Sequence, residues 1–178
     1  MATKATIIKA DVQIADMNRQ YYQDHRLTLA QHPSETEERL MIRLLAFALH
    51  ADDELSFASG LSAENEPDLW KKDLTGNVKL WIDLGQVDEK RIRKACSKAD
   101  RVVIYTYQAR TAKPWWQQIK EKLDRFDNLS VISIENKSET PIAALAQRNL
   151  QLQCSIQDTT VYLSSDSGSV ELNLNPLK

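Results

Sequence analysis

The stretch from Glu66 to Gln86 constrains the fold more than any other part of this chain. It reads EPDLWKKDLTGNVKLWIDLGQ, in which two segments of strand-forming residues, 68–72 and 78–84, flank the tripeptide Thr75-Gly76-Asn77. Glycine and asparagine in a short connection between such segments are typical of a β-hairpin. We therefore expect two neighbouring strands here, joined by a tight turn.

Two aspartates of this stretch are candidate metal ligands. Asp68 enters the first strand after a proline, and Asp83 lies near the end of the second strand. Alternation places Asp83 beside Trp81 on one face, opposite the four aliphatic residues of the same strand. Two carboxylates on neighbouring strands suit a hard divalent cation. The alternative is that each aspartate caps a turn or faces water, as aspartates at strand ends commonly do.

The same hairpin resembles a known protein family. The segments Glu66–Trp70 and Leu80–Gln86 are similar to the signature of the YaeQ family, and the similarity extends over nearly the whole chain. That family is assigned to the PD-(D/E)XK nuclease-like fold. The resemblance therefore implies an α/β fold, with a mixed β-sheet flanked by helices, a restriction-endonuclease-like core and extra N-terminal and C-terminal β-strands. This fold hosts active and inactive members alike.

The resemblance also implies a set of site residues. Asp68 and Asp83 would hold Mg²⁺ or Mn²⁺, and a glutamate of the first helix, Glu38, would complete the site. The metal would activate water and offset charge on a phosphodiester of DNA or RNA.

One position departs from the pattern of the wider fold, which has a lysine two residues after the second acid. Here that position is Gly85, followed by Gln86. We list Gln86 with the three acids as a catalytic candidate, reached through a bulge, although its amide supplies no charge. Lys79 and Lys94 are the alternative sources of a cation.

The first helix is expected to open at Pro33-Ser34 and to run to about His50. Ser34 and Glu37 have capping-box spacing. Glu38 falls at the edge of the apolar arc, where a carboxylate is costly unless a cation or hydrogen bonds meet it. The alternative is a first-turn glutamate favoured by the helix dipole. Arg39 and Arg43 are expected on the side opposite the apolar face.

The rest of the chain contains further strand and helix patterns without a linker or repeat, so we expect a single domain over residues 1–178. An N-terminal hairpin is predicted from strands 6–17 and 21–31. A short strand at 55–58 and a loop at 59–66 precede the central hairpin. Helices are predicted at 88–99, 113–126 and 138–148, and strands at 101–107, 129–135, 150–156, 160–164 and 169–174.

Charge is distributed unevenly along the sequence. Residues 34–68 include nine acidic and two basic residues, whereas residues 84–125 include eleven basic and five acidic residues. The predicted helix at 88–99 presents four cations, Lys90, Arg93, Lys94 and Lys98, which we expect to bind nucleic acid. The adjacent Trp115 and Trp116 suit either packing on the sheet or stacking on bases. Two oppositely charged, solvated faces are the alternative interpretation.

Composition excludes several classes of protein. The chain of 178 residues is 42% hydrophobic and 27% charged, as in soluble globular proteins. It shows no signal-peptide pattern, no apolar run long enough for a membrane helix and two isolated cysteines, so we expect a cytoplasmic protein without membrane contact. P-loop, dinucleotide-binding and zinc-protease motifs are absent from the sequence.

Three functional hypotheses follow. The leading one is a metal-dependent nuclease-like protein acting on nucleic-acid phosphodiesters. The second is a catalytically degenerate nuclease fold that serves as a nucleic-acid-binding or protein-binding module. The third is a protein-interaction domain without nucleic-acid contact, which the small net charge of −2 favours.

Overall fold

The computed structural model describes residues 4–59 and 63–178. The chain divides into two compact units. Unit 1 contains the chain up to His50 together with Asn136–Leu174, and unit 2 contains Ala51–Glu135 and Asn175–Lys178. Gly60, in the predicted loop at 59–66, lies outside the described residues. The single domain over residues 1–178 stays a prediction, and each unit is described here by itself.

Unit 1 is built on five strands in the order β2-β1-β8-β9-β10. Their bounds are β1 Thr6–Asp16, β2 Tyr21–Gln31, β8 Asn149–Gln157, β9 Thr160–Ser165 and β10 Gly168–Pro176. The pair β1–β8 is parallel and the other pairs are antiparallel. The N-terminal hairpin and the three tail strands predicted from the sequence are confirmed, with bounds shifted by at most two residues.

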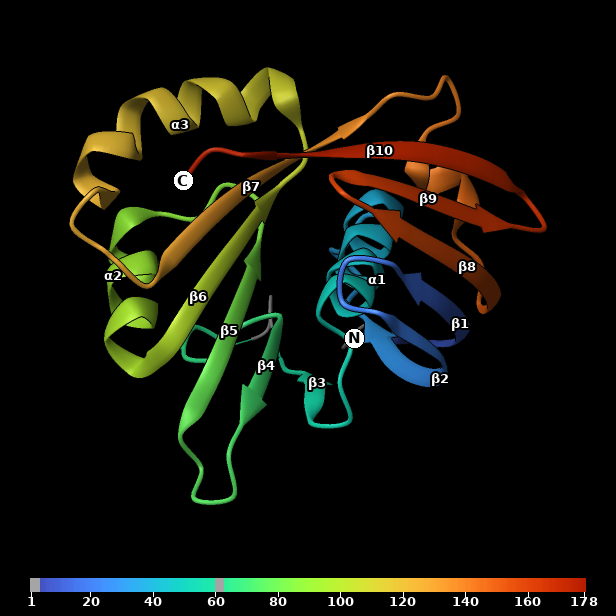
Figure 1. Cartoon of the computed structure of the whole chain (residues 1–178), viewed down its shortest axis with the longest axis horizontal. Coiled ribbons are helices and arrows are strands. Elements are labelled where there is room, and N and C mark those ends of the chain that lie inside the picture. The colour runs from blue at the N-terminus through green and yellow to red at the C-terminus, as the bar shows by residue number, and fades with distance from the viewer. Residues whose placement is uncertain (1–3, 60–62) are drawn as a thin grey trace. The chain divides into compact units, whose positions relative to one another are not determined.

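One face of this sheet forms the core of unit 1 with helix α1 (Glu37–His50), shown in Figure 1. Burial alternates along β1 and β8, and the buried positions are mostly aliphatic, as expected for a sheet that is solvated on one face. The helix covers the buried face with an apolar side that includes Leu40, Met41, Leu44 and Leu45.

Two helix predictions in unit 1 need correction. Helix α1 begins at Glu37, and Thr36 Oγ1 accepts the hydrogen bond from the Arg39 amide at 3.1 Å, so the cap is Thr36 and not the predicted Ser34. The Ser34 hydroxyl instead lies 2.7 Å from His32 Nδ1.

The predicted helix at 138–148 is a single 3-10 turn, η2 (Ile142–Leu145). Two local features prevent an α-helix from starting earlier. The Asn136 side chain forms a turn by donating to the Thr140 carbonyl at 2.9 Å and accepting from the Ser138 amide at 2.9 Å. In addition, Pro141 disfavours the helical conformation of the residue before it.

Unit 2 contains five strands in the order β7-β6-β5-β4-β3. Their bounds are β3 Leu55–Phe57, β4 Leu69–Lys72, β5 Val78–Leu84, β6 Ala99–Thr106 and β7 Leu129–Asn136. Strands β5, β6 and β7 are parallel, whereas β3–β4 and β4–β5 are antiparallel. The central hairpin and the strand–helix–strand unit predicted after it are therefore confirmed.

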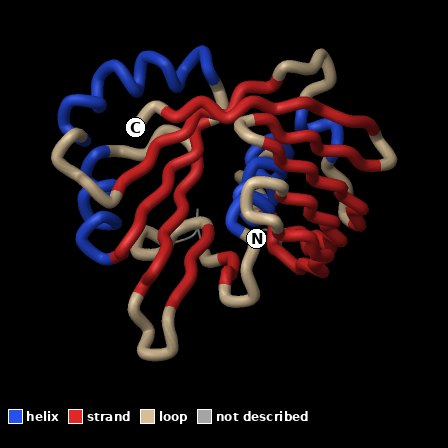
Figure 2. Tube along the Cα trace, viewed as in Figure 1, coloured by secondary structure: helices blue, strands red, loops and turns tan. Residues whose placement is uncertain are grey.

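Two helices pack on the sheet of unit 2, α2 (Glu89–Lys98) and α3 (Ala109–Leu123) (Figure 2). Helix α2 matches its prediction, but α3 begins four residues before the predicted start. Pro114 consequently lies inside the helix and not in its first turn. At this interior position it costs one intrahelical hydrogen bond. The core between these helices and the sheet includes Trp81, Ile92, Val102, Ile104, Ile119 and Leu123.

The predicted fold class is confirmed at the level of a mixed α/β fold, because parallel and antiparallel strands occur together with helices in both units. Among the described residues, no helix combines the length and the apolar character that crossing a membrane requires.

Candidate functional site

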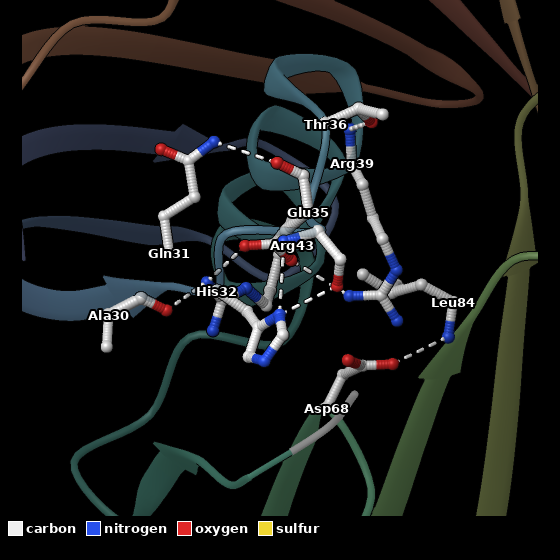
Figure 3. A network of polar contacts seen from close by, with 10 residues as sticks. Ala30, Gln31, His32, Glu35, Thr36, Arg39, Arg43, Asp68 and Leu84 are labelled. Atoms are coloured by element: carbon white, nitrogen blue, oxygen red, sulfur yellow. Dashed lines mark hydrogen bonds and ion pairs between the residues drawn. The ribbon is translucent and has the colours of Figure 1, made fainter. Parts of the chain in front are cut away.

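The two aspartates singled out by the sequence come together in unit 2. The antiparallel register pairs Leu69 with Ile82, which brings the preceding Asp68 next to Asp83 on the neighbouring strand. The Asp68 amide donates to the Ile82 carbonyl at 3.0 Å, and its Oδ2 accepts from the Leu84 amide at 3.0 Å (Figure 3). Each aspartate is only 2% exposed, so the carboxylates are buried and held by the hairpin itself.

Asp83 is engaged by a cation that sequence reasoning missed. Arg91, on α2, donates from Nε to Asp83 Oδ2 at 2.9 Å and from Nη2 to Asp83 Oδ1 at 3.0 Å. Trp81 Nε1 also donates to Oδ2, at 3.0 Å. The hydrogen bond to Asp83 raises the pKa of Arg91, and the charge of Asp68 adds to this effect. The guanidinium is thus the counterion of Asp83.

Arg91 also fixes the chain that leads into the hairpin. Its Nη1 donates to the Glu64 carbonyl at 3.0 Å, and its Nη2 donates to the Glu66 carbonyl at 2.8 Å. One sequence feature could have predicted that Arg91 faces the sheet. It precedes Ala95, which is buried, by four residues, so both lie on the same side of α2.

The backbone conformation at residue 85 explains why glycine, and not the lysine of the wider fold, stands at this position. Gly85 has φ +96°, a conformation that side chains other than glycine rarely adopt, and its amide donates to the Tyr105 carbonyl at 2.7 Å. Gln86 is exposed, and its Nε2 bonds Thr111 Oγ1 on α3. Among the alternative cations, Lys79 pairs with Asp100 at 3.0 Å, and Lys94 contacts the Asn65 side chain.

Glu38 lies in unit 1, in the first turn of α1, and is half-buried. Asp68 and Asp83 belong to unit 2, so the convergence of the three acids stays a prediction. Over residues 4–59 and 63–178, no group of three or more histidine, cysteine, aspartate or glutamate residues is arranged to hold a metal ion.

The acid pair as it stands does not fit a divalent cation. Both oxygens of Asp83 accept hydrogen bonds from Arg91, and Trp81 adds a third. A guanidinium in contact with the carboxylate would repel Mg²⁺ or Mn²⁺ at the same oxygens. Occupation by either ion therefore requires Arg91 to leave Asp83.

Unit 1 contains a second buried ionic group, formed by Arg43 of α1 and Glu35, which precedes the helix. Arg43 is buried, and its Nη2 donates to Glu35 Oε1 at 2.7 Å and to the Ala30 carbonyl at 2.9 Å (Figure 3). Arg39 Nη1 donates to Glu35 Oε2 at 2.9 Å. Arg43, which the sequence places on the side opposite the apolar face, is thus buried, and Glu35 compensates its charge.

The predicted nucleic-acid-binding residues share the outer side of α2. Lys90, Arg93, Lys94 and Lys98 are all exposed. The only acid within the helix, Glu89, is met by two further cations, at 3.7 Å from Lys122 and 4.0 Å from Arg125. We call these four exposed residues of α2 the basic face.

The two adjacent tryptophans both pack against the core of unit 2 and are partly buried. Trp115 Nε1 donates to the Val87 carbonyl at 2.9 Å, which ties the middle of α3 to the segment that follows β5. Packing accounts for these contacts, whereas the stacking role proposed from the sequence stays a prediction.

Comparison with known proteins gives one consistent family. Residues 1–174 match the family model described as YaeQ protein. The chain is 47% identical to "Uncharacterized protein YaeQ" of Escherichia coli (strain K12) over 174 residues, which covers 98% of this chain and 96% of the relative. The homologue of Salmonella typhi is 45% identical over the same length.

Solved structures agree. The crystal structure of YaeQ protein from Xanthomonas axonopodis pv. citri has a TM-score of 0.90 and 48% identity and covers 98% of each chain. That of YaeQ protein from Pseudomonas syringae has a TM-score of 0.89 and 30% identity, covering 98% of this chain and 96% of the other. The resemblance seen in the hairpin residues is thus confirmed, and this chain belongs to the YaeQ family.

Proposed function

We propose that this protein is a nucleic-acid-binding module built on a catalytically degenerate nuclease-like fold. In this proposal unit 2 carries the restriction-endonuclease-like core of the PD-(D/E)XK group. The acid pair of that core is closed by an arginine, and the protein binds its ligand without cleaving it.

The observation that carries the proposal is the division of α2 into two sides. Arg91 turns toward the sheet and neutralises Asp83, whereas the basic face points to solvent. Four exposed cations spaced over nine residues of one helix suit contacts with successive phosphates, which supply most of the affinity in non-specific nucleic-acid binding.

The hairpin supports the degenerate character of the core. Gly85 occupies the position of the motif lysine with a positive φ, so a lysine there would be strained. Gln86 is engaged by Thr111 and carries no charge. With Arg91 bound to both oxygens of Asp83 and glycine at the motif lysine position, activation of water by this site is disfavoured.

A second candidate function, the metal-dependent nuclease, is favoured by one observation. Asp68 and Asp83 are both buried and lie opposite each other on neighbouring segments, which brings together two carboxylates of the kind that Mg²⁺ and Mn²⁺ prefer as ligands. In that candidate Asp68 and Asp83 would hold Mg²⁺ or Mn²⁺ together with Glu38, after Arg91 had moved away.

The test measures binding of fluorescein-labelled duplex DNA, single-stranded DNA and RNA of matched length. Fluorescence anisotropy reports the affinity at low and at physiological salt. Wild-type protein should bind at low salt, with an affinity that falls steeply as salt rises. Replacing all four residues of the basic face by alanine should abolish binding, and each single replacement should reduce the salt slope by about 0.9 for duplex DNA.

The matched control replaces Lys120, which is not part of the basic face but lies on the neighbouring helix. Lys120→Ala should leave the affinity nearly unchanged. Absence of binding at low salt, or equal affinity in the fourfold variant, overturns the proposal. Metal-dependent cleavage of the same labelled substrates that is lost in Asp83→Asn favours the nuclease candidate instead.

A further inference from the structure

The turn of the central hairpin exposes an apolar side chain that the fold does not use. Leu74 has a relative exposure of 102%, the highest among the exposed large hydrophobic residues of the described chain. It lies in the segment Asp73–Asn77, which we call the hairpin tip. Single exposed leucines are common at protein surfaces, so exposure alone assigns no role to Leu74. A role has to be argued from the hydrogen bonds that hold the tip and from its position beside the basic face.

The hairpin tip is held in one conformation by the Asp73 carboxylate. Its Oδ1 accepts from the Thr75 amide at 2.9 Å, the Thr75 hydroxyl at 2.8 Å and the Asn77 amide at 2.9 Å, while Oδ2 accepts from Asn77 Nδ2 at 3.1 Å. Backbone bonds join Asp73 to Asn77 and to Gly76, whose φ is +88°. Leu74 is therefore presented on a preorganised loop, which lowers the entropic cost of binding through it.

The hairpin tip adjoins the basic face. Strand β5 begins at Val78 immediately after the tip, and Val78 pairs in parallel with Ala99, the residue that follows Lys98 at the end of α2. A salt bridge of 3.0 Å from Lys79 to Asp100 ties the same two segments together. The line of cations from Lys90 to Lys98 thus ends next to the hairpin, whose loop extends beyond the strands (Figures 1 and 2).

The charges of the tip are compatible with a phosphate backbone. Two exposed lysines flank the tip: the Lys72 ammonium lies 3.7 Å from the centre of the Trp70 ring, and the Lys79 ammonium lies 3.0 Å from Asp100 and 3.8 Å from Asp73. The one acid of the tip, Asp73, directs its oxygens at donors within the loop. The basic face runs from Lys90 to Lys98 on α2, about 12 Å along the helix axis, the length of roughly three to four base-pair steps.

We propose that Leu74 is an apolar wedge that enters a base step of duplex DNA while the phosphate backbone lies along the basic face. This inference rests on the proposed function, because it assumes that α2 binds nucleic acid. Leucine is among the residues that unstack base steps in this way, with flanking cations holding the bent duplex.

The experiment uses full-length protein and duplexes with 2-aminopurine at successive positions, together with duplexes that carry a fluorophore pair at their ends. Wild-type protein should raise 2-aminopurine fluorescence at one step and shorten the end-to-end distance. Leu74→Ser should lose both signals and bind the duplex several-fold more weakly, with an unchanged salt slope. Leu74→Met, which keeps an apolar side chain, should retain both signals.

Two controls separate this inference from the proposed function. Ile7→Ser replaces another exposed apolar residue, on unit 1, and should change neither signal. If Leu74→Ser binds and bends the duplex like wild type, the wedge is overturned while the proposed function stands, and Leu74 serves another kind of partner. If wild-type protein binds no duplex at low salt, the proposed function falls and the wedge falls with it.

Discussion

Arg91 and Asp83 form a two-pronged ion pair across the core of unit 2, with Nε–Oδ2 and Nη2–Oδ1 distances of 2.9 and 3.0 Å. The Asp83 side chain is 3% exposed and that of Arg91 is 24% exposed. The pair links a buried strand to the helix that carries the basic face. Its arginine also holds the segment before the hairpin, so three parts of unit 2 depend on one side chain.

We predict that Arg91→Ala lowers the free energy of unfolding by about 3 kcal/mol, because Asp83 is left buried without its counterion. Urea denaturation at neutral pH measures the change. Arg93→Ala, on the exposed side of the same helix, is the matched control and should change stability by no more than about 0.5 kcal/mol. Adding Asp83→Asn to Arg91→Ala should restore part of the loss; a double variant as unstable as the sum of both changes contradicts the pairing.

A second prediction concerns acid pH and the hairpin tip. Hydrogen bonds, led by that from the Thr75 side chain, lower the pKa of Asp73 from 3.8 to about 2. A lowered pKa in the folded state means that the stabilisation is complete above pH 3.8 and is lost as pH falls through about 2. NMR titration of the Asp73 carboxyl carbon should show this late protonation, and the Thr75 and Asn77 amides should exchange faster below it.

The control for this prediction is Asp73→Asn, which should exchange rapidly at these amides at every pH. A carboxyl that titrates near 3.8 would show that the loop does not hold Asp73 as described. Because the carboxylate is at the surface, we attach no free energy of unfolding to its protonation.

The strands and the basic face were predictable because local patterns determine them. Turn residues between strand-forming segments located the central hairpin, and an amphipathic pattern located α2. In the structure Asp88 caps this helix, since its Oδ1 accepts from the Arg91 amide at 2.8 Å. The helix expected at 138–148 failed because the turn made by the Asn136 side chain competes with helix formation there.

The ion pairs were not predictable in the same way. An arginine in an amphipathic pattern is assigned to the polar side, but Arg43 and Arg91 are each drawn inward by one carboxylate that is distant along the chain or in another element. Which arginine meets which acid depends on the rotation of a helix over its sheet. The hydrophobic periodicity gives the rotation of a helix about its axis too coarsely to predict which side chains come within hydrogen-bonding distance.

A third prediction tests the buried ionic group of unit 1. Glu35→Ala removes the acceptor of both Arg39 and Arg43, and we expect a loss of about 3–5 kcal/mol in the free energy of unfolding, since Arg43 is buried. Glu37→Ala is the control, because Glu37 is exposed in the first turn of α1. Equal unfolding midpoints for the two variants would mean that Glu35 has no such role.

The last prediction separates the two candidate functions through metal binding. A ligand that binds only the folded state raises the melting temperature by mass action, and Mg²⁺ and Mn²⁺ favour oxygen ligands such as those of Asp68 and Asp83. With Arg91 on Asp83, we expect wild-type protein to show no shift in melting temperature with either ion at millimolar concentration. Arg91→Gln removes the guanidinium from both Asp83 oxygens and should gain a shift, since no cation then competes with the ion for that carboxylate.

Adding Asp83→Asn to Arg91→Gln should abolish the gained shift, which shows that the ion binds at the acid pair. Metal is removed with a chelator that is then dialysed away, and circular dichroism confirms that the protein is folded before each melt. A shift in wild-type protein that Asp83→Asn removes would mean that the ion displaces Arg91, as the nuclease candidate requires. Cleavage of labelled DNA or RNA by that same protein, lost in Asp83→Asn, would then establish catalysis; a shift without cleavage leaves a metal-binding but degenerate core.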